Sequence, residues 1–328
     1  MKWKKLLPAA WAFCLAIGIS NTECAAQEIY LYGGAIRESD TRDITYAWTL
    51  EYRQDLTKNW AVSFSWLNEG HFQQHHRDGH ALQIWGRTDP LWKGIVLAAG
   101  IGPYRYFDTR MAHQEHSYVD SHGWGTVLSF SATCPLYDRW LFSLRSNYIN
   151  SDRSIDTFSL QAGIGYQLEP FPPGSSPGSP RDKPRKNEIT AYFGQIVVNS
   201  GESESDTAWS LEYRRSLGRY LDWSVGWMNE NNPGPIHRKG MIAELWLTKS
   251  FFHDRLSLSL GTGPYLMIDK QKKSGPHEDD DLCLAGIVTM SGAYEFYSPW
   301  VIRISWHRTV TDYNRDTDII LGGIGLRF

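Results

Sequence analysis

The sequence predicts an all-β protein whose antiparallel strands cross a membrane and close into barrels. Three observations lead to this fold class: a leader of the exported type, short stretches in which apolar and polar residues alternate, and an internal repeat. Aromatic residues make up 14% of the chain, although the mean hydropathy is polar at −0.42. This combination is typical of strands that have one lipid-facing side and one polar side, with aromatic girdles at the membrane surfaces.

Residues 1–26 predict a signal peptide, so we expect the mature chain to begin near Gln27. A lysine-rich start precedes an apolar run from Leu6 to about Ile19, and Cys24-Ala25-Ala26 supplies the small residues of a cleavage site. No later segment has the roughly 18 consecutive apolar residues of a spanning helix. These features predict export to the cell outer membrane of a Gram-negative envelope.

Two copies of one module follow the leader. Trp48-Thr-Leu-Glu51-Tyr52-Arg53 recurs 161 positions later as Trp209-Ser-Leu-Glu212-Tyr213-Arg214. Such self-similarity indicates a duplicated structural unit. Further pairs support the repeat: Glu69 with Glu230, His76 with His237, Trp85 with Trp246, Gly102-Pro103-Tyr104 with Gly263-Pro264-Tyr265, and Asp108 with Asp269.

The repeat divides the chain into a first barrel unit at 27–168 and a second at 188–328. Residues 169–187 between them are rich in Pro, Gly and Ser, which is typical of an extended, solvated linker. The strands could close in two ways, as two eight-stranded barrels in tandem or as one sixteen-stranded barrel. The linker between self-similar units favours two barrels, because eight strands are already enough to close.

Eight strands are expected in the first unit, an even number as in bacterial outer-membrane barrels. Tyr46, Trp48 and Leu50 point to one side of the second strand, and Thr49 and Glu51 to the other. The expected strands lie at about 28–37, 43–53, 59–69, 78–88, 94–107, 123–134, 139–149 and 155–168.

The polar sides of these strands predict a lumen filled by interacting side chains. Arg145 lies on the polar side of its strand, and a charge in a narrow lumen needs a partner, for which Glu51 and Glu69 are candidates. The lumen network is expected to include Glu51, Arg145, Asn147 and Glu212. In the second unit Ser305 takes the place of Arg145, so the two lumens are expected to differ.

The C-terminus is an alternating strand, Gly323-Ile-Gly-Leu-Arg-Phe328, that resembles the assembly signal of bacterial outer-membrane proteins. The resemblance implies that Phe328 engages the barrel-assembly machinery. With the N-terminus in the periplasm, odd-numbered connections face outward. The third (Gly70–Arg77) and fifth (Asp108–His122) are expected to be the longest loops, and the even-numbered ones near Asp55, Asp89 and Tyr137 to be short turns.

Histidines and carboxylates concentrate around these two outer connections of the first unit. Histidine can act near neutral pH as a general base, as a metal ligand or as an ordinary loop residue. The spacing matches no zinc motif, so neither a metal nor a cofactor is expected. The net charge of −3 argues against a nucleic-acid partner. The histidines are His71, His75, His76, His80, His113, His116 and His122.

The eight-stranded size, polar lumen and histidine-bearing rim resemble the lipid A 3-O-deacylases and, more distantly, the lipid A palmitoyltransferases. The resemblance implies hydrolysis of an acyl ester of lipopolysaccharide at the outer rim. In the deacylases a His-x-Ser pair acts with a carboxylate, and the nearest segments here are His116-Ser117 and Ser121-His122. The candidate roles are His76 or His122 as base, Ser117 or Ser121 as nucleophile, and Glu69 or Asp120 as orienting acid.

A non-enzymatic barrel is the alternative function. Such a barrel would serve surface binding or adhesion, polysaccharide secretion or passive transport. Repeat comparison bears on the choice, because Glu69 and His76 recur as Glu230 and His237, whereas His71, His75 and His122 have no histidine counterpart. If the first unit is catalytic, we therefore expect the second to be degenerate.

Overall fold

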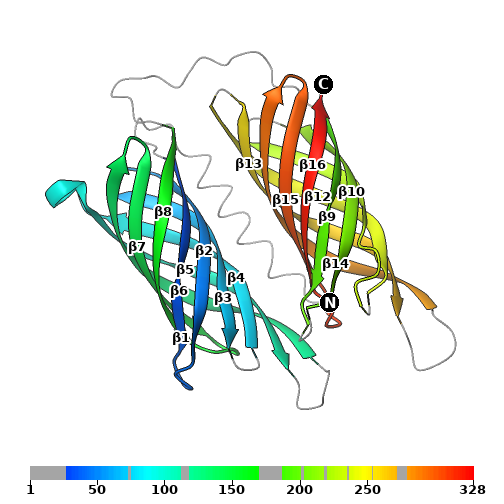
Figure 1. Cartoon of the computed structure of the whole chain (residues 1–328), viewed down its shortest axis with the longest axis horizontal. Helices are drawn as coiled ribbons and strands as arrows, with labels where there is room; N and C mark the ends of the chain where they lie inside the picture. The colour runs from blue at the N-terminus through cyan, green and yellow to red at the C-terminus, as the bar shows by residue number, and fades with distance from the viewer. Residues whose placement is uncertain are drawn as a thin grey trace. The chain divides into compact units, whose positions relative to one another are not determined.

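The computed structural model describes residues 27–72, 75–111, 118–169, 187–200, 203–217, 220–234, 236–252, 254–271 and 279–328. Within these ranges the chain forms two closed antiparallel barrels of eight strands each (Figure 1). The predicted fold class and the two-barrel closure are confirmed, and the alternative of one sixteen-stranded barrel is wrong. The expected signal peptide and most of the expected linker lie outside the described residues and stay predictions.

The first barrel is a simple up-and-down meander. Each strand pairs with the next, and β8 pairs with β1 to close the ring, with Glu28 opposite Gln167 and Arg37 opposite Phe158. A short 3₁₀ turn, η2 (Trp92–Gly94), lies between β4 and β5. The strands are β1 (Gln27–Glu38), β2 (Ile44–Asp55), β3 (Trp60–Phe72), β4 (His75–Arg87), β5 (Val96–Met111), β6 (Tyr118–Tyr137), β7 (Trp140–Ser151) and β8 (Thr157–Glu169).

The second barrel repeats this topology. Its seam joins the last strand to the first, and the backbones of Phe328 and Asn187 exchange two hydrogen bonds of 2.9 and 3.2 Å there. The strands are β9 (Asn187–Val198), β10 (Ser205–Ser216), β11 (Leu221–Asn229), β12 (Arg238–Phe251), β13 (Leu256–Gln271), β14 (Asp279–Tyr297), β15 (Trp300–Val310) and β16 (Thr317–Arg327).

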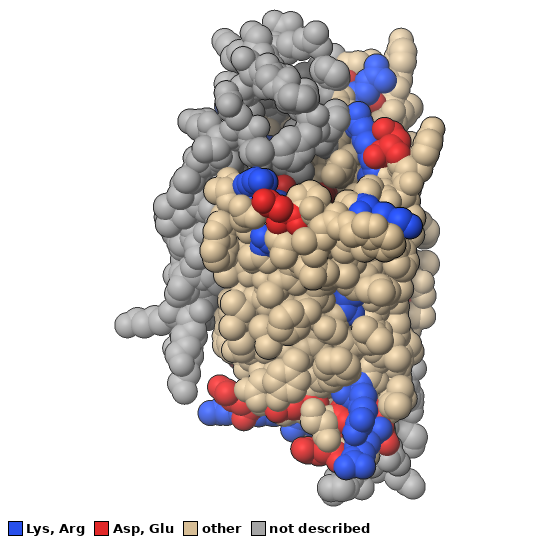
Figure 2. Space-filling model, turned by 90° about the vertical axis from the view of Figure 1, so that its left-hand side faces the viewer, with Lys and Arg blue, Asp and Glu red and all other residues tan. Residues whose placement is uncertain are grey.

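Side chains alternate between lumen and exterior as the sequence predicts. In β2, Thr49, Glu51 and Arg53 are buried, whereas their neighbours Trp48, Leu50 and Tyr52 are only partly covered. Figure 2 shows one face on which charged side chains gather toward the two ends and are sparse over the broad middle. Exposed apolar residues include Leu31, Ile84, Ile101, Phe130, Leu144, Leu160 and Ile164 in the first barrel and Phe193, Leu211, Met241, Leu245, Ile304, Ile320 and Ile324 in the second.

The long outer loops expected at Gly70–Arg77 and Asp108–His122 are mostly strand, so this prediction is wrong. Cross-strand pairing continues to Phe72 opposite His75, and β5 and β6 are 16 and 20 residues long. Within these two segments, only 73–74 and 112–117 fall outside the described residues. By contrast, the turn at Asp89, expected to be short, spans 88–95.

The extra strand length has a physical consequence for the first barrel. A tilted strand needs about 9–11 residues to cross a bilayer, so β5 and β6 exceed what the membrane requires. The excess carries Asp120 and His122 of the predicted site on hydrogen-bonded strand backbone rather than on a loop.

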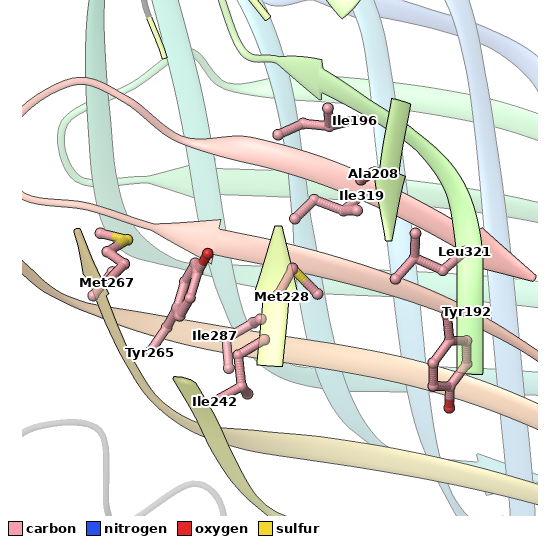
Figure 3. Close-up of a cluster of buried hydrophobic side chains, with 11 residues drawn as sticks. Tyr192, Ile196, Ala208, Met228, Ile242, Tyr265, Met267, Ile287, Ile319 and Leu321 are labelled. Carbon is pink, nitrogen blue, oxygen red and sulfur yellow. The ribbon is translucent and has the colours of Figure 1, made fainter. Parts of the chain in front are cut away.

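The second lumen contains an apolar cluster that is larger than the corresponding cluster of the first lumen, which consists of Leu67, Ala81, Tyr104, Tyr106, Val127 and Ile149. Ile319 and Leu321 stand at the positions that Ser159 and Gln161 hold in the first unit. Figure 3 shows this cluster, whose side chains come from strands all around the barrel. Its buried members are Tyr192, Ile196, Ala208, Met228, Ile242, Tyr265, Met267, Ala285, Ile287, Ile319 and Leu321.

Candidate functional site

The middle of the first lumen holds a network centred on Arg145. Its guanidinium lies 2.5 Å from Glu51 Oε2 and donates to Asn147 Oδ1 and to Gln83 Oε1 at 2.6 and 2.7 Å. Glu51 also accepts from Arg53 at 2.7 Å. All five side chains are buried, and buried charges persist only with such pairing. Glu212, expected in the same network, takes the place of Glu51 in the separate second barrel and does not join it.

A second cluster fills the outer part of the first lumen. Arg77 donates two hydrogen bonds to the Glu69 carboxylate, from Nε at 2.8 Å and from Nη2 at 2.6 Å. Tyr104 and Thr157 each donate to the same carboxylate at 2.5 Å. Four donors satisfy both carboxylate oxygens of this buried group. Glu69 is therefore held in place by Arg77, Tyr104 and Thr157, and its expected role of orienting a catalytic histidine stays a prediction.

The same cluster occurs in the second barrel, in looser form. Arg238 Nη1 lies 3.4 Å from Glu230 Oε2, and Thr317 donates to that oxygen at 3.3 Å. Arg238 also lies 3.5 Å from Asp269. Because both repeats keep these residues, the cluster belongs to the architecture of the unit rather than to a function of one copy.

Candidate residues on β6 point to different sides of the barrel wall. Ser121 shares its face with the lumen-facing Ser129, and its hydroxyl donates to the backbone oxygen of Asp108 at 3.3 Å. Asp120 and His122 fall on the opposite, outward face, because neighbouring residues of a strand alternate. A Ser121–His122 pair is therefore not formed. Ser117 lies outside the described residues.

His76 is also separated from Glu69. Strand β4 turns His76 outward, since Arg77 beside it faces the lumen, and the His76 ring contacts His71 instead, with Nδ1 atoms 3.0 Å apart. The predicted base and acid thus lie on opposite faces of the wall. The described residues of the proposed catalytic set are divided between the two faces of the wall: Glu69 and Ser121 face the lumen, and His76, Asp120 and His122 face outward.

A histidine–carboxylate pair that the predicted set omitted lies at the mouth of the first lumen. His75 Nδ1 is 3.1 Å from Asp108 Oδ1, and the His75 side chain is 23% exposed. Asp108 Oδ2 accepts from Arg110 at 2.8 Å and from Ser154 at 2.7 Å. Strand parity could have found this pair, because His75 shares the lumen face with Arg77. The second repeat has Ile236 in place of His75.

The outward face of β4–β6 carries a group of cationic and aromatic side chains, which we call the outer-face cluster: His80, Arg105, Phe107, His122 and Trp124. Arg105 lies directly across from His80 in the strand register. Its guanidinium carbon is 5.9 Å from the Phe107 ring centre and 5.4 Å from that of Trp124. The rings of His80 and His122 meet Phe107 edge-on at 5.5 and 5.6 Å.

In the part of the chain that the structure describes, no group of three or more His, Cys, Asp or Glu residues is arranged to hold a metal ion. Cys134 and Cys283, one in each barrel, form no disulfide among the described residues. Among the described residues, no helix is long and apolar enough to span a membrane.

Closed eight-stranded barrels with apolar exteriors and internally paired polar groups define an outer-membrane β-barrel protein. Every backbone hydrogen bond in such a wall can be made between strands, and only lipid can cover so much outward apolar surface. The chain therefore belongs in the cell outer membrane.

Comparison with solved structures finds proteins with this type of fold. The N-terminal β-barrel domain of Pseudomonas aeruginosa OprF matches with 12% identity and a TM-score of 0.35, covering 43% of this chain and 96% of its own. Neisserial surface protein A matches with 7% identity and a TM-score of 0.35, over 44% of this chain and 96% of its own. The attachment invasion locus protein Ail of Yersinia pestis matches with 11% identity and a TM-score of 0.34, over 43% and 96%.

No protein-family model matches the sequence, and no curated protein matches it. The resemblance to the lipid A deacylases and palmitoyltransferases therefore stays a prediction.

Proposed function

We propose that this chain is a non-porous outer-membrane protein that binds the phosphorylated lipid of the outer leaflet, lipopolysaccharide, through the outer-face cluster of its first barrel. The observation that carries this proposal is Arg105, a guanidinium on the outward face of β5 held between Phe107 and Trp124. A charge facing the hydrocarbon core is costly. Near the headgroups, the same charge can form strong, often bidentate hydrogen bonds to phosphate.

The height of Arg105 in the wall supports this assignment. Arg105 is the tenth residue of β5 counted from Val96 at the periplasmic end. Strands that rise about 3.3 Å per residue and tilt by about 45° would place it about 20 Å above that end, near the outer edge of the apolar band of about 25 Å. Aromatic residues beside it are typical of this interface.

The filled lumens argue against passive transport. The interior of an eight-stranded barrel is just wide enough for side chains to fill it. The Arg145 network and the Glu69 cluster occupy the first lumen, and an eleven-residue apolar cluster occupies part of the second. Function is then expected at the outer surface rather than through the barrel.

Binding of lipopolysaccharide to the purified chain in nanodiscs tests the proposal. Arg105→Leu copies the second repeat, which has Leu266 at this position. Loss of one or two charge-assisted hydrogen bonds predicts about a 10- to 100-fold weaker affinity for phosphorylated lipopolysaccharide. Dephosphorylated lipopolysaccharide should bind both proteins equally weakly. Equal affinity of wild type and variant for the phosphorylated form would refute the proposal.

A second candidate function, acyl-ester hydrolysis of an envelope lipid, is favoured by the His75–Asp108 pair. A carboxylate bound to Nδ1 fixes the tautomer that leaves Nε2 able to take a proton from water or a hydroxyl. Asp108 would orient the ring, and Arg110 and Ser154 would hold Asp108 in place.

Mass spectrometry of lipid A from cells with and without the chain tests this activity. A changed acyl pattern that His75→Gln abolishes, while His237→Gln in the second barrel preserves it, would support hydrolysis at the first rim. An acyl pattern that is the same with and without the chain would eliminate this candidate and leave lipid binding.

A further inference from the structure

We propose that His71 and His76 form a binding site for a divalent transition-metal ion, such as Zn²⁺, Ni²⁺ or Cu²⁺, on the outer rim of the first barrel. The two residues lie directly opposite each other in the register of β3 and β4. His76 Nδ1 is 3.0 Å from His71 Nδ1 and 3.3 Å from His71 Nε2. The ring centres are 4.2 Å apart, and the pair lies at the exposed rim.

These distances are those that a shared metal ion requires. Two imidazole nitrogens bound to one ion at about 2.0–2.1 Å stand about 2.9–3.4 Å apart, over the range from octahedral to tetrahedral angles. The observed nitrogens already lie at this separation, so binding needs only small ring rotations. Without an ion, at least one of two facing ring nitrogens must carry a proton to make their contact favourable.

The donor set selects the kind of metal. Imidazole nitrogen suits Zn²⁺, Ni²⁺ and Cu²⁺, whereas Ca²⁺ and Mg²⁺ prefer oxygen ligands. Paired strands hold both histidines, so little backbone entropy is lost on binding. Two protein ligands leave positions for water, and we therefore expect affinity in the micromolar range rather than that of a closed structural site.

The second repeat supplies a natural comparison at the same place. His76 corresponds to His237, but His71 corresponds to Asn232, and His237 Nδ1 contacts Asn232 Oδ1 at 2.5 Å. The amide replaces the second imidazole and offers no nitrogen lone pair to a metal. The contact between these two positions is thus retained in the second barrel, where both residues lie in the connection between β11 and β12, and only the first barrel has two imidazole rings there.

The experiment uses the full chain, without a histidine tag, in detergent micelles. Zn²⁺ binding is measured by calorimetry, and Cu²⁺ coordination by electron paramagnetic resonance. We expect one equivalent of metal with two nitrogen ligands in the wild type. His71→Asn, which copies the second repeat, should weaken binding at least tenfold, as should His76→Asn, whereas His237→Asn should not change it. Asn232→His should add a second equivalent.

Heat-modifiable migration on gels confirms that each variant is folded before binding is measured. Undiminished affinity in both His71→Asn and His76→Asn, or an equal loss in His237→Asn, would overturn the proposal. Retained binding in the first two variants would assign the metal to other histidines of the chain.

Discussion

At the scale of single residues, the first lumen depends on a few buried charges. The sequence predicts that Arg145 needs an acidic partner, and Glu51 is that partner at 2.5 Å. Asn147 is also expected in this network, but the contact of Arg145 with Gln83 could not be chosen in advance, because strand parity gives the face of a residue but not its height in the barrel. The same limit explains why the contact of Glu69 with Arg77 could not be predicted.

Arg145→Ser, which introduces the residue of the second repeat, should destabilise the first barrel. The substitution removes one of the two guanidinium groups that pair with Glu51, and leaving a buried charge incompletely paired typically costs about 3–5 kcal/mol. Denaturant unfolding in micelles measures the change. Adding Glu51→Gln should recover part of the loss, because the remaining charge is then removed. No loss in the single variant would show that Arg53 alone satisfies Glu51.

A smaller effect is expected from breaking the outer cluster of the second barrel. The Arg238–Glu230 distance is 3.4 Å, against 2.6 Å for Arg77–Glu69. Glu69→Gln should therefore reduce the free energy of unfolding more than Glu230→Gln does, since shorter charge-assisted hydrogen bonds are stronger. Comparison of the two variants by denaturant unfolding checks the order, and equal losses would contradict it.

At the scale of strands, alternation predicted all eight elements of the first barrel to within a few residues, except at the outer rim. There the outer ends of β5 and β6, Asp108–Met111 and Tyr118–His122, are rich in polar residues, which also suits loops. Backbone pairing between strands, which the composition of one strand cannot reveal, extends these elements. As a consequence, residues expected on mobile loops stand at fixed faces of the wall, and Ser121 and His122 point apart.

The repeated Gly-Pro-Tyr segment interrupts both sheets in the same way. Pairing of β4 with β5 runs from Ala81 opposite Tyr104 to Ile84 opposite Ile101 and skips the residues between them. A Cβ atom on Gly102 would lie 1.8 Å from the backbone oxygen of Leu82. Glycine is therefore required where the two backbones approach closely.

Gly102→Ala should destabilise the first barrel by about 1–3 kcal/mol, because the strands must move apart to accommodate the methyl group. Gly33→Ala is the matched control, since a Cβ there meets no atom within 4 Å. Unfolding of both variants in micelles measures the difference. Equal stability of the two variants would show that the close approach at Gly102 is not needed.

At the scale of the whole molecule, the two repeats share the strand topology and several lumen contacts, and they differ in some of the side chains that fill the lumen. Trp85 and Trp246 each donate from Nε1 to a lumen serine at 2.8 Å, and the guanidinium carbons of Arg53 and Arg214 lie 4.1 Å from their rings. The repeat in the sequence predicts this equivalence. The extension of the apolar cluster in the second lumen by Ile319 and Leu321 was not predicted, because it requires knowing which side chains meet across the barrel.

Assembly should depend on the C-terminal residue. The backbone of Phe328 pairs with Asn187 at the seam of the second barrel, and its aromatic ring is part of the proposed signal for the assembly machinery. Deletion of Phe328 should lower the amount of heat-modifiable protein in the outer membrane several-fold, and Phe328→Tyr should retain it. Quantitative immunoblotting of membrane fractions measures both. Normal levels after deletion would show that the machinery recognises another segment.

The proposed function at the outer surface depends on two separately closed, filled barrels, and conductance in planar lipid bilayers tests whether the barrels are closed. Purified, folded chain should insert without opening a stable channel, because side chains occupy both lumens. Arg145→Ser, if folded, should also remain closed or show only small flickering events. A steady conductance like that of sixteen-stranded porins, observed with wild-type protein, would contradict the two-barrel structure and the surface function derived from it.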